Sequence, residues 1–266
     1  MSAYRERRAL IGGGAVVWTR TAGAWPQRVL PDGCTDLIWS DAGPVGELFV
    51  AGPDTRAHLA SGPPGSRAVG LRFAPGTGPA VLGVPAHELR DQRVPLAALW
   101  PDAEVRRLAE RIAEGIAEGI GEGIAEGIGE GIGGRITGRG AGREAAPGRV
   151  LEEAALGRLR TAEPPDPVLA AIVAGVSRGT GVARIAAAVG LGERQLRRRS
   201  LAAFGYGPRT LGRVLRLNRA LDLARTGVRF AEVAAAAGYA DQAHLAREVR
   251  TLTGVPLGRL LQGSGG

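Results

Sequence analysis

One stretch decides the fold of the C-terminal third of this 266-residue chain: it reads GYADQAHLAREVRTLTGVP and spans residues 238–256. Its apolar residues Leu245, Val249 and Leu252 recur at i, i+4 and i+7, the spacing of one face of a helix. A Gly-Tyr turn precedes them, and a Gly-Val-Pro sequence stops the helix. The stretch therefore predicts a helix over residues 241–251 whose outer side is polar and basic.

The same arrangement extends outward along the chain. A short amphipathic helix is predicted before the turn, over residues 230–237. A similar pair precedes it: residues 182–189, a turn at Gly190, and residues 193–203, which begin ERQLRRR. A helix, a tight turn with glycine and a basic second helix are typical of the helix-turn-helix motif. A longer helix over 208–224 is predicted to join the two units, and Asp166 with Pro167 is predicted to start a helix before the first.

Charge is concentrated in this part of the chain. The net charge is +8, and every one of the 34 basic residues is arginine. Residues 166–266 hold 15 arginines and six acidic residues, a net charge of +9, whereas the remainder is close to neutral. A basic domain beside a neutral one indicates a polyanionic partner, and arginine and glutamine on an outward helix face can pair with guanine and adenine.

The N-terminal half has a different pattern. Short apolar clusters are separated by Gly, Pro and Asp, at residues 16–18, 37–39, 48–50 and 69–73. Such clusters favour strands bounded by turns, and Leu71 and Phe73 around Arg72 show the alternation of a half-buried strand. A small β-rich domain is predicted. Residues 85–89 and 94–100 are interpreted as short helical or capping segments, followed by a helix from about residue 103.

A low-complexity repeat follows. From residue 112 to 136 the chain repeats a four-residue unit with Ile at every fourth position and five Glu, each directly followed by a Gly. Each repeat drifts by about 40° around a helix, so no flat apolar face persists, and each Gly costs roughly 1 kcal/mol relative to Ala. We interpret the tract as a repeat expansion that extends a natural helix; a partner-binding or coiled-coil helix is the alternative. Residues 133–147 are predicted to be flexible, 151–159 helical and 163–167 a stiff linker.

Residues 238–256 closely resemble the C-terminal signature of AraC/XylS-type regulators, and the resemblance extends over about residues 168–261. It implies two helix-turn-helix units, joined by a long helix, that enter successive major-groove segments about one helical turn apart. It carries the family's base-contacting positions to Arg194, Arg197, Arg198, Gln242, His244 and Arg247. Gln195 and Arg250 share these helices and complete the predicted DNA-binding set.

The first unit departs from the family pattern. Gly192 stands where a Ser cap is usual, and Arg199 and Ser200 occupy positions that normally hold apolar and aromatic core residues. A lost core aromatic can cost several kcal/mol, so weaker packing of this unit is expected, with Phe204 refilling part of the space.

The N-terminal half resembles, more loosely, the sensor-like domain of a subset of such regulators, through LPDGCTDLIW at residues 30–39, VAGP at 50–53, GVP at 83–85 and LRDQRVP at 89–95. By analogy it is similar to a reduced cupin-like barrel. The aspartates Asp32, Asp36 and Asp54, with Trp39 and Arg56, are candidates for lining a small-molecule pocket.

Other functional classes find little support. The three histidines have no metal-ligand spacing, so no metal, cofactor or catalytic residue is predicted and the chain is not expected to be an enzyme. The one cysteine, Cys34, is interpreted as a core or turn residue; DNA alkylation-repair regulators offer a reactive-cysteine alternative, but their multi-cysteine zinc cluster is absent here. No signal peptide or membrane span is expected, which favours the cytoplasm and its nucleoid.

The sequence thus predicts a two-domain α+β protein. Residues 1–101 form a β-rich sensor or dimerisation domain, 102–165 a helical and low-complexity region with a Pro-rich linker, and 166–262 a tandem helix-turn-helix domain. The predicted function is sequence-specific transcription regulation on double-stranded DNA, with a small-molecule effector, a homodimer and RNA polymerase as further partners. Two alternatives remain: a module whose N-terminal half serves only dimerisation or protein contact, and nonspecific binding through charge alone.

Overall fold

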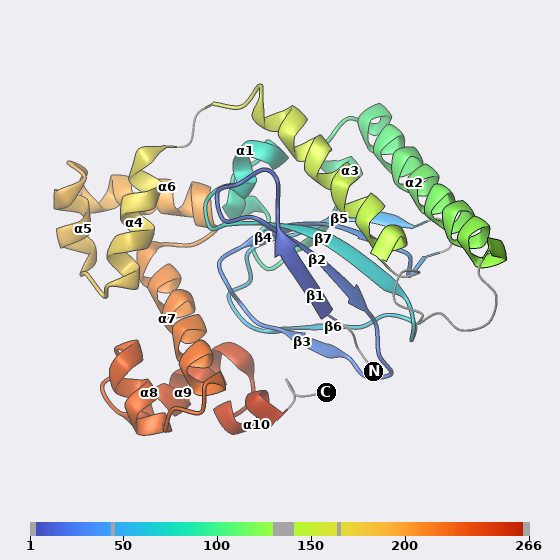
Figure 1. The fold of residues 1–266 in the computed structure, drawn as a ribbon. Helices are drawn as coiled ribbons and strands as arrows, with labels where there is room; N and C mark the ends of the chain where they lie inside the picture. Colours follow the sequence, from blue (N-terminus) through green and yellow to red (C-terminus); the bar gives the residue numbers. More distant parts are fainter. Residues whose placement is uncertain (1–3, 44–45, 130–140, 164–165, 263–266) are drawn as a thin grey trace.

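The structure is a computed structural model that describes residues 4–43, 46–129, 141–163 and 166–262. Its N-terminal domain is an antiparallel β-sheet with helices on one face, and its C-terminal domain is helical (Figure 1). The α+β, two-domain architecture predicted from the sequence is confirmed.

Six strands form the main sheet, in the order β1-β2-β7-β4-β5-β8 with every neighbouring pair antiparallel. Their bounds are β1 (Tyr4–Arg8), β2 (Val16–Thr21), β4 (Thr35–Ser40), β5 (Glu47–Ala51), β7 (Arg67–Phe73) and β8 (Arg93–Pro95). A second, two-stranded sheet pairs β3 (Gln27–Val29) with β6 (His58–Ala60). The four predicted apolar clusters are the inner strands β2, β4, β5 and β7.

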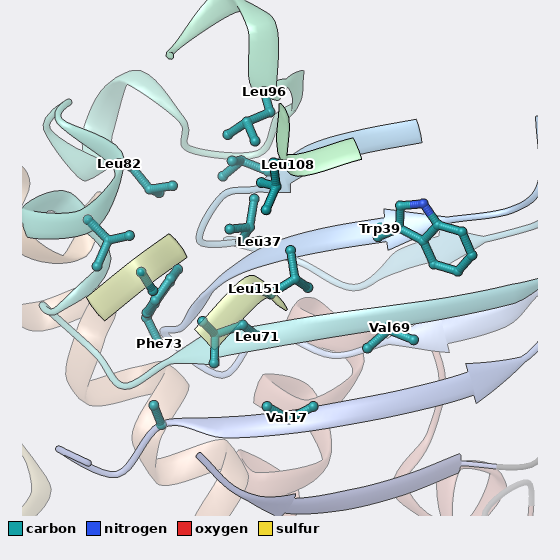
Figure 2. Close-up of a cluster of buried hydrophobic side chains, with 14 of the residues drawn as sticks. Val17, Leu37, Trp39, Val69, Leu71, Phe73, Leu82, Leu96, Leu108 and Leu151 are labelled. Atoms are coloured by element: carbon teal, nitrogen blue, oxygen red, sulfur yellow. The ribbon is translucent and has the colours of Figure 1, made fainter. Parts of the chain in front are cut away.

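One face of the main sheet carries the core of the domain. Side chains at alternate positions of β2, β4 and β7 point to this face, and Leu37, Leu71 and Phe73 are almost completely buried there (Figure 2). Three helices cover it: α1 (Gly78–Leu82), α2 (Asp102–Gly129) and α3 (Ala141–Leu159). The helices contribute Leu82, Leu108 and Leu151 to the same cluster (Figure 2).

The opposite face is smaller and partly polar. Trp18, Ile38 and Ala51 form a separate cluster there, and the indole Nε1 of Trp18 donates to the Asp36 carboxylate at 2.6 Å. Gly70, which pairs with Trp18 across β2 and β7, leaves the room that this indole fills.

One prediction in the middle of the chain was wrong in part, and another was wrong over the described residues. Residues 94–100 begin in strand β8 and continue in the short 3₁₀ helix η2 (Leu96–Ala98), because Arg93–Pro95 pair with β5 at the sheet edge; η1 (Ala86–Glu88) lies in the other predicted segment. Helix α3 starts at Ala141, so residues 141–147, predicted to be flexible, are helical. Its Gly148 packs against Val17 of the sheet, a long-range contact that favours the longer helix.

The repeat tract continues helix α2 as far as Gly129, in agreement with the extended-helix interpretation. Residues 130–140 and 164–165, the rest of the repeat and the prolines of the linker, lie outside the described residues. Among the described helices, none has both the length and the apolar character that crossing a membrane requires.

The C-terminal domain follows the predicted helices closely. They are α4 (Pro167–Ser177), α5 (Val182–Ala188), α6 (Glu193–Phe204), α7 (Pro208–Arg225), α8 (Phe230–Ala237), α9 (Gln242–Thr253) and α10 (Leu257–Gln262). Asp166 caps α4 as predicted, its carboxylate accepting from Val168 N at 3.0 Å. Helix α10 was not predicted. Two apolar clusters, one for each helix-turn-helix unit, meet along α7.

Candidate nucleic-acid interface

The first candidate recognition helix is α6. Its buried residues Leu196, Ser200 and Phe204 lie four apart and form one stripe against α4, α5 and α7. This leaves the opposite side to solvent, where Arg194, Arg197 and Arg198 are all exposed. The stripe thus orients the basic side of the helix away from the protein.

The unusual residues of this unit are accommodated. Ser200 is completely buried, and its Oγ donates to the carbonyl of Tyr206 at 2.8 Å. Arg199 leaves the core and pairs with Asp166 at 2.8 Å, while Phe204 fills the apolar space. A hydrogen bond and an ion pair therefore stand where the family pattern has apolar and aromatic residues, and Phe204 is buried in the core as expected. The weaker packing expected of this unit stays a prediction.

The second candidate recognition helix is α9. Asp241 caps its N-terminus by accepting from His244 N at 2.6 Å, and Gly254 ends it with φ of 77°. Leu245, Val249 and Leu252 are buried, at the spacing that the sequence predicted. The exposed side carries Gln242, Arg247 and Arg250.

Helix α7 holds this second unit in place. Arg213 makes a two-point ion pair with Glu248 of α9. One turn further on, Arg216 lies over the ring of Tyr239 at 5.1 Å and donates to the carbonyl of Gly238 at 3.1 Å. Arg213 and Arg216 therefore stabilise helix α9 and the turn that precedes it. This role was not predicted from the sequence, although a spacing of three residues places Arg213 and Arg216 on one face of a helix.

The predicted DNA-binding residues fall into two groups. Five arginines are exposed and, within the described residues, their guanidinium groups make no ion pair or hydrogen bond; these are Arg194, Arg197, Arg198, Arg247 and Arg250. Gln242 is likewise exposed. The other two serve local structure, since Gln195 Oε1 accepts from Gly192 N at 3.1 Å and His244 Nδ1 accepts from Ala240 N at 3.2 Å.

Further exposed arginines of the domain have no side-chain partner in the described part of the chain. They are Arg178, Arg184, Arg209, Arg219 and Arg259. These arginines were not among the predicted DNA-binding residues, because they lie outside the two recognition helices.

The residues considered for a small-molecule pocket come together only in part, because Asp32 and Asp36 both pair with Arg72. Trp39 belongs to the helix-covered core, whereas Asp36 lies on the other face, beside Arg72 and Trp18. Burial raises the pKa of Asp36 to about 6, although Arg72 acts in the opposite direction. Asp54 pairs with Arg93 at 2.6 Å. These aspartates therefore hold the domain together by ion pairs.

Comparison with known families finds one match in each half of the chain. Residues 185–263 match the family model of a helix-turn-helix domain, of the AraC type. Residues 15–95 match a domain of unknown function (DUF6597). A comparison with curated proteins finds no match.

Among solved structures, the chain is similar to ToxT from Vibrio cholerae. One ToxT structure has 11% sequence identity to this chain and a TM-score of 0.46. The match covers 95% of this chain and 98% of the ToxT chain. A second, bound to (E)-4-(8-methylnaphthalen-1-yl)but-3-enoic acid, has 12% identity and a TM-score of 0.45 and covers 98% of both chains. A third, bound to an unsaturated fatty acid, has 12% identity, a TM-score of 0.45 and 96% coverage of both.

The two helix-turn-helix units and the family match lead to the same conclusion. The chain is a DNA-binding transcription regulator with an AraC-type helix-turn-helix domain behind an N-terminal β-sheet domain.

Proposed function

We propose that the protein binds specific DNA sites by inserting α6 and α9 into successive major-groove segments on one side of the duplex. The 18-residue helix α7 separates the two units. At 1.5 Å per residue it is about 27 Å long, comparable with the roughly 34 Å between successive major-groove segments.

One observation carries this proposal. The exposed arginines of α6 and α9 make no ion pair in the described structure, while Arg199 and Arg213 beside them pair with Asp166 and Glu248. Exposed guanidinium groups without partners keep all five donors for guanine edges and phosphates. An interface ready for a polyanion thus lies on the outer sides of these two helices.

The predicted residues take different roles in this proposal. Arg194, Arg197 and Arg198 of α6 and Gln242 and Arg247 of α9 face base edges or the adjoining phosphates. Gln195 and His244 also contribute to DNA binding. The local hydrogen bonds use Gln195 Oε1 and His244 Nδ1, so the amide nitrogen of Gln195 and the second ring nitrogen of His244 remain for contacts with DNA. Arg250, near the C-terminal end of α9, contacts the backbone, because the first residues of a recognition helix reach the bases.

The N-terminal domain has a regulatory role in this proposal. Residues 1–101 serve as a sensor whose effector changes DNA affinity, with 102–165 as the connecting region and 166–262 as the DNA-binding domain. Self-association and contact with RNA polymerase belong to the same proposal, as does location in the cytoplasm, associated with the nucleoid. The alternative, in which the N-terminal half only dimerises or binds protein, predicts that no small molecule changes DNA affinity.

The proposal assigns no catalysis to the chain. Cys34 is the chain's one thiol, and burial raises its pKa well above the usual value, with Asp32 and Asp36 adding to the effect. A protonated thiol is a poor nucleophile, which argues against a reactive-cysteine function.

The test is selection of genomic DNA fragments by the purified chain at near-physiological salt, followed by affinities for enriched and scrambled fragments. We expect a motif of two half-sites about one helical turn apart, bound on the order of 10³-fold more tightly than scrambled DNA. Uniform binding with a steep salt dependence would instead indicate recognition of charge alone.

A matched pair of variants completes the test. The double variant Arg197→Ala, Arg198→Ala removes two charges from α6, and Arg106→Ala, Arg107→Ala removes two from α2 in the other domain. We expect only the first to lose the preference for the enriched fragment. Equal losses would contradict a recognition role for α6.

A further inference from the structure

The N-terminal domain contacts the C-terminal end of α6. A Cβ at Gly205, which ends this helix, would lie 2.5 Å from Cγ of Pro53 and 3.1 Å from the carbonyl oxygen of Ala86, so the two domains meet tightly here. Arg90 donates to the carbonyl of Gly205 at 3.4 Å. Phe204 packs closely over Gly76.

The same domain also contacts the C-terminal end of α9. Arg28 of β3 donates from Nη1 to the carbonyl of Thr253 at 2.8 Å. The backbone N–H of Ala57, just before β6, donates to the carbonyl of Leu252 at 2.7 Å. These bonds satisfy carbonyls in the last turn of α9, which have no partner within the helix.

Between these two contacts, the loop of residues 30–34 lies along α7. The carbonyl of Pro31 accepts from Asn218 at 3.2 Å. The backbone at Gly33 approaches Tyr206 and Leu211 so closely that a Cβ there would lie 3.3 and 3.5 Å from them. Arg72 of the main sheet pairs with Asp32 at 3.3 Å and so fixes this loop to its own domain.

These contacts cover the short link between α6 and α7, about which the first helix-turn-helix unit would rotate. α6 and α7 are joined by Gly205, Tyr206 and Gly207, and glycine leaves the backbone unusually free to rotate. The N-terminal domain packs directly on the first two of these residues. The basic outer sides of α6 and α9, in contrast, remain accessible to solvent. Arg194, Arg197 and Arg247 are exposed although the two domains are in contact.

We propose that the N-terminal domain fixes the two recognition helices relative to each other and thereby selects the spacing of the two half-sites, with Arg28 and Arg90 as positioning residues. The inference rests on the proposed function, because it concerns the same two helices on DNA. It gives the N-terminal domain a part in DNA selection that acts through the two helices it contacts.

Half-site spacing is a sensitive readout of this geometry. Each inserted base pair moves one half-site by about 3.4 Å along the duplex and rotates it by about 34°. Rigidly held helices tolerate neither change, whereas helices that hinge at residues 205–207 tolerate both.

The experiment measures affinity of the full chain for its selected site with zero to three base pairs inserted or deleted between the half-sites, and for each half-site alone. Wild type is compared with the double variant Arg28→Ala, Arg90→Ala and with the control Arg106→Ala, Arg107→Ala. We expect the double variant to lose about tenfold in its preference for the native spacing, the effect of two hydrogen bonds, with unchanged half-site affinity.

Two results would overturn the inference. One is an unchanged spacing profile in the double variant while its circular dichroism and melting temperature match wild type. The other is an equal gain in affinity at every spacing, which would make the domain contact inhibitory. Failure of the proposed function is distinguishable, because wild type itself would then show no selected site and no spacing preference.

Discussion

Arg213 on α7 donates two hydrogen bonds to Glu248 on α9, from Nε to Oε2 at 2.8 Å and from Nη2 to Oε1 at 3.2 Å. The pair joins the central helix of the DNA-binding domain to its second recognition helix, and both side chains are partly exposed. The hydrogen bonds from Arg213 hold the pKa of Glu248 below its usual value, against a smaller effect of burial.

We expect Glu248→Gln to lower the free energy of unfolding by about 0.2–1 kcal/mol at pH 7, the range for a solvent-accessible pair. A carboxylate whose pKa falls on folding stabilises the protein above its unfolded pKa of about 4.5, and this contribution is lost as the pH decreases through its folded value. Urea denaturation at a series of pH values measures it. The control Glu232→Gln removes an exposed pair on α8, and an equal loss in both variants at all pH values would contradict the prediction.

Gly70 and Gly157 should respond to alanine in opposite ways. A Cβ at Gly70 would overlap the indole of Trp18 and displace it from Asp36, so we expect Gly70→Ala to cost about 1–3 kcal/mol. A Cβ at Gly157 of α3 meets open space, and Gly157→Ala should stabilise by about 0.5–1 kcal/mol. Thermal unfolding of both variants tests the pair. Stabilisation by Gly70→Ala would show that the Trp18 indole does not lie against Gly70.

Most of the C-terminal helices could be predicted from the sequence because local signals agree there. Asp166, Asp241 and Gly254 stand at helix ends, and each helix has a single apolar stripe between its ends. Where pattern and caps coincide, the helix bounds follow to within about two residues.

The remaining features depend on contacts between distant residues. Ser200 looked misplaced because its partner, the carbonyl of Tyr206, belongs to a turn whose position only the fold determines. Strand β1 was missed because all its side chains are exposed, so it has no apolar alternation. The contacts between the domains use backbone atoms such as the carbonyls of Pro31 and Thr253. Such contacts cannot be predicted from the pattern of side chains in the sequence.

Two hydroxyl groups at the junction of α6 and α7 should behave differently. Ser200 Oγ is buried and donates to the Tyr206 carbonyl, so Ser200→Ala should cost about 1 kcal/mol. Tyr206 Oη is buried without a partner in the described structure, so Tyr206→Phe should be neutral or stabilising. Melting temperatures of the two variants decide this. A clear loss for Tyr206→Phe would mean that a water or a ligand satisfies the hydroxyl.

Arg247 and Arg250 offer a test within one helix. Both are exposed on α9 and, among the described residues, both lack an ion-pair partner, but Arg247 lies one turn nearer the N-terminal end. Since that end reaches the base edges, Arg247→Ala should reduce discrimination between operator and scrambled DNA by about 1–3 kcal/mol. Arg250→Ala should weaken binding to both DNAs alike and lower the salt slope by about 1.

The measurement is affinity for matched and scrambled fragments across a salt series, with Arg259→Ala on α10 as an exposed control. The two readouts are independent, because discrimination compares two DNAs at one salt concentration and the slope compares two salt concentrations on one DNA. If both variants lose discrimination equally, base reading extends to the C-terminal half of α9. If neither does, α9 serves as a backbone clamp, and sequence is read by α6 alone.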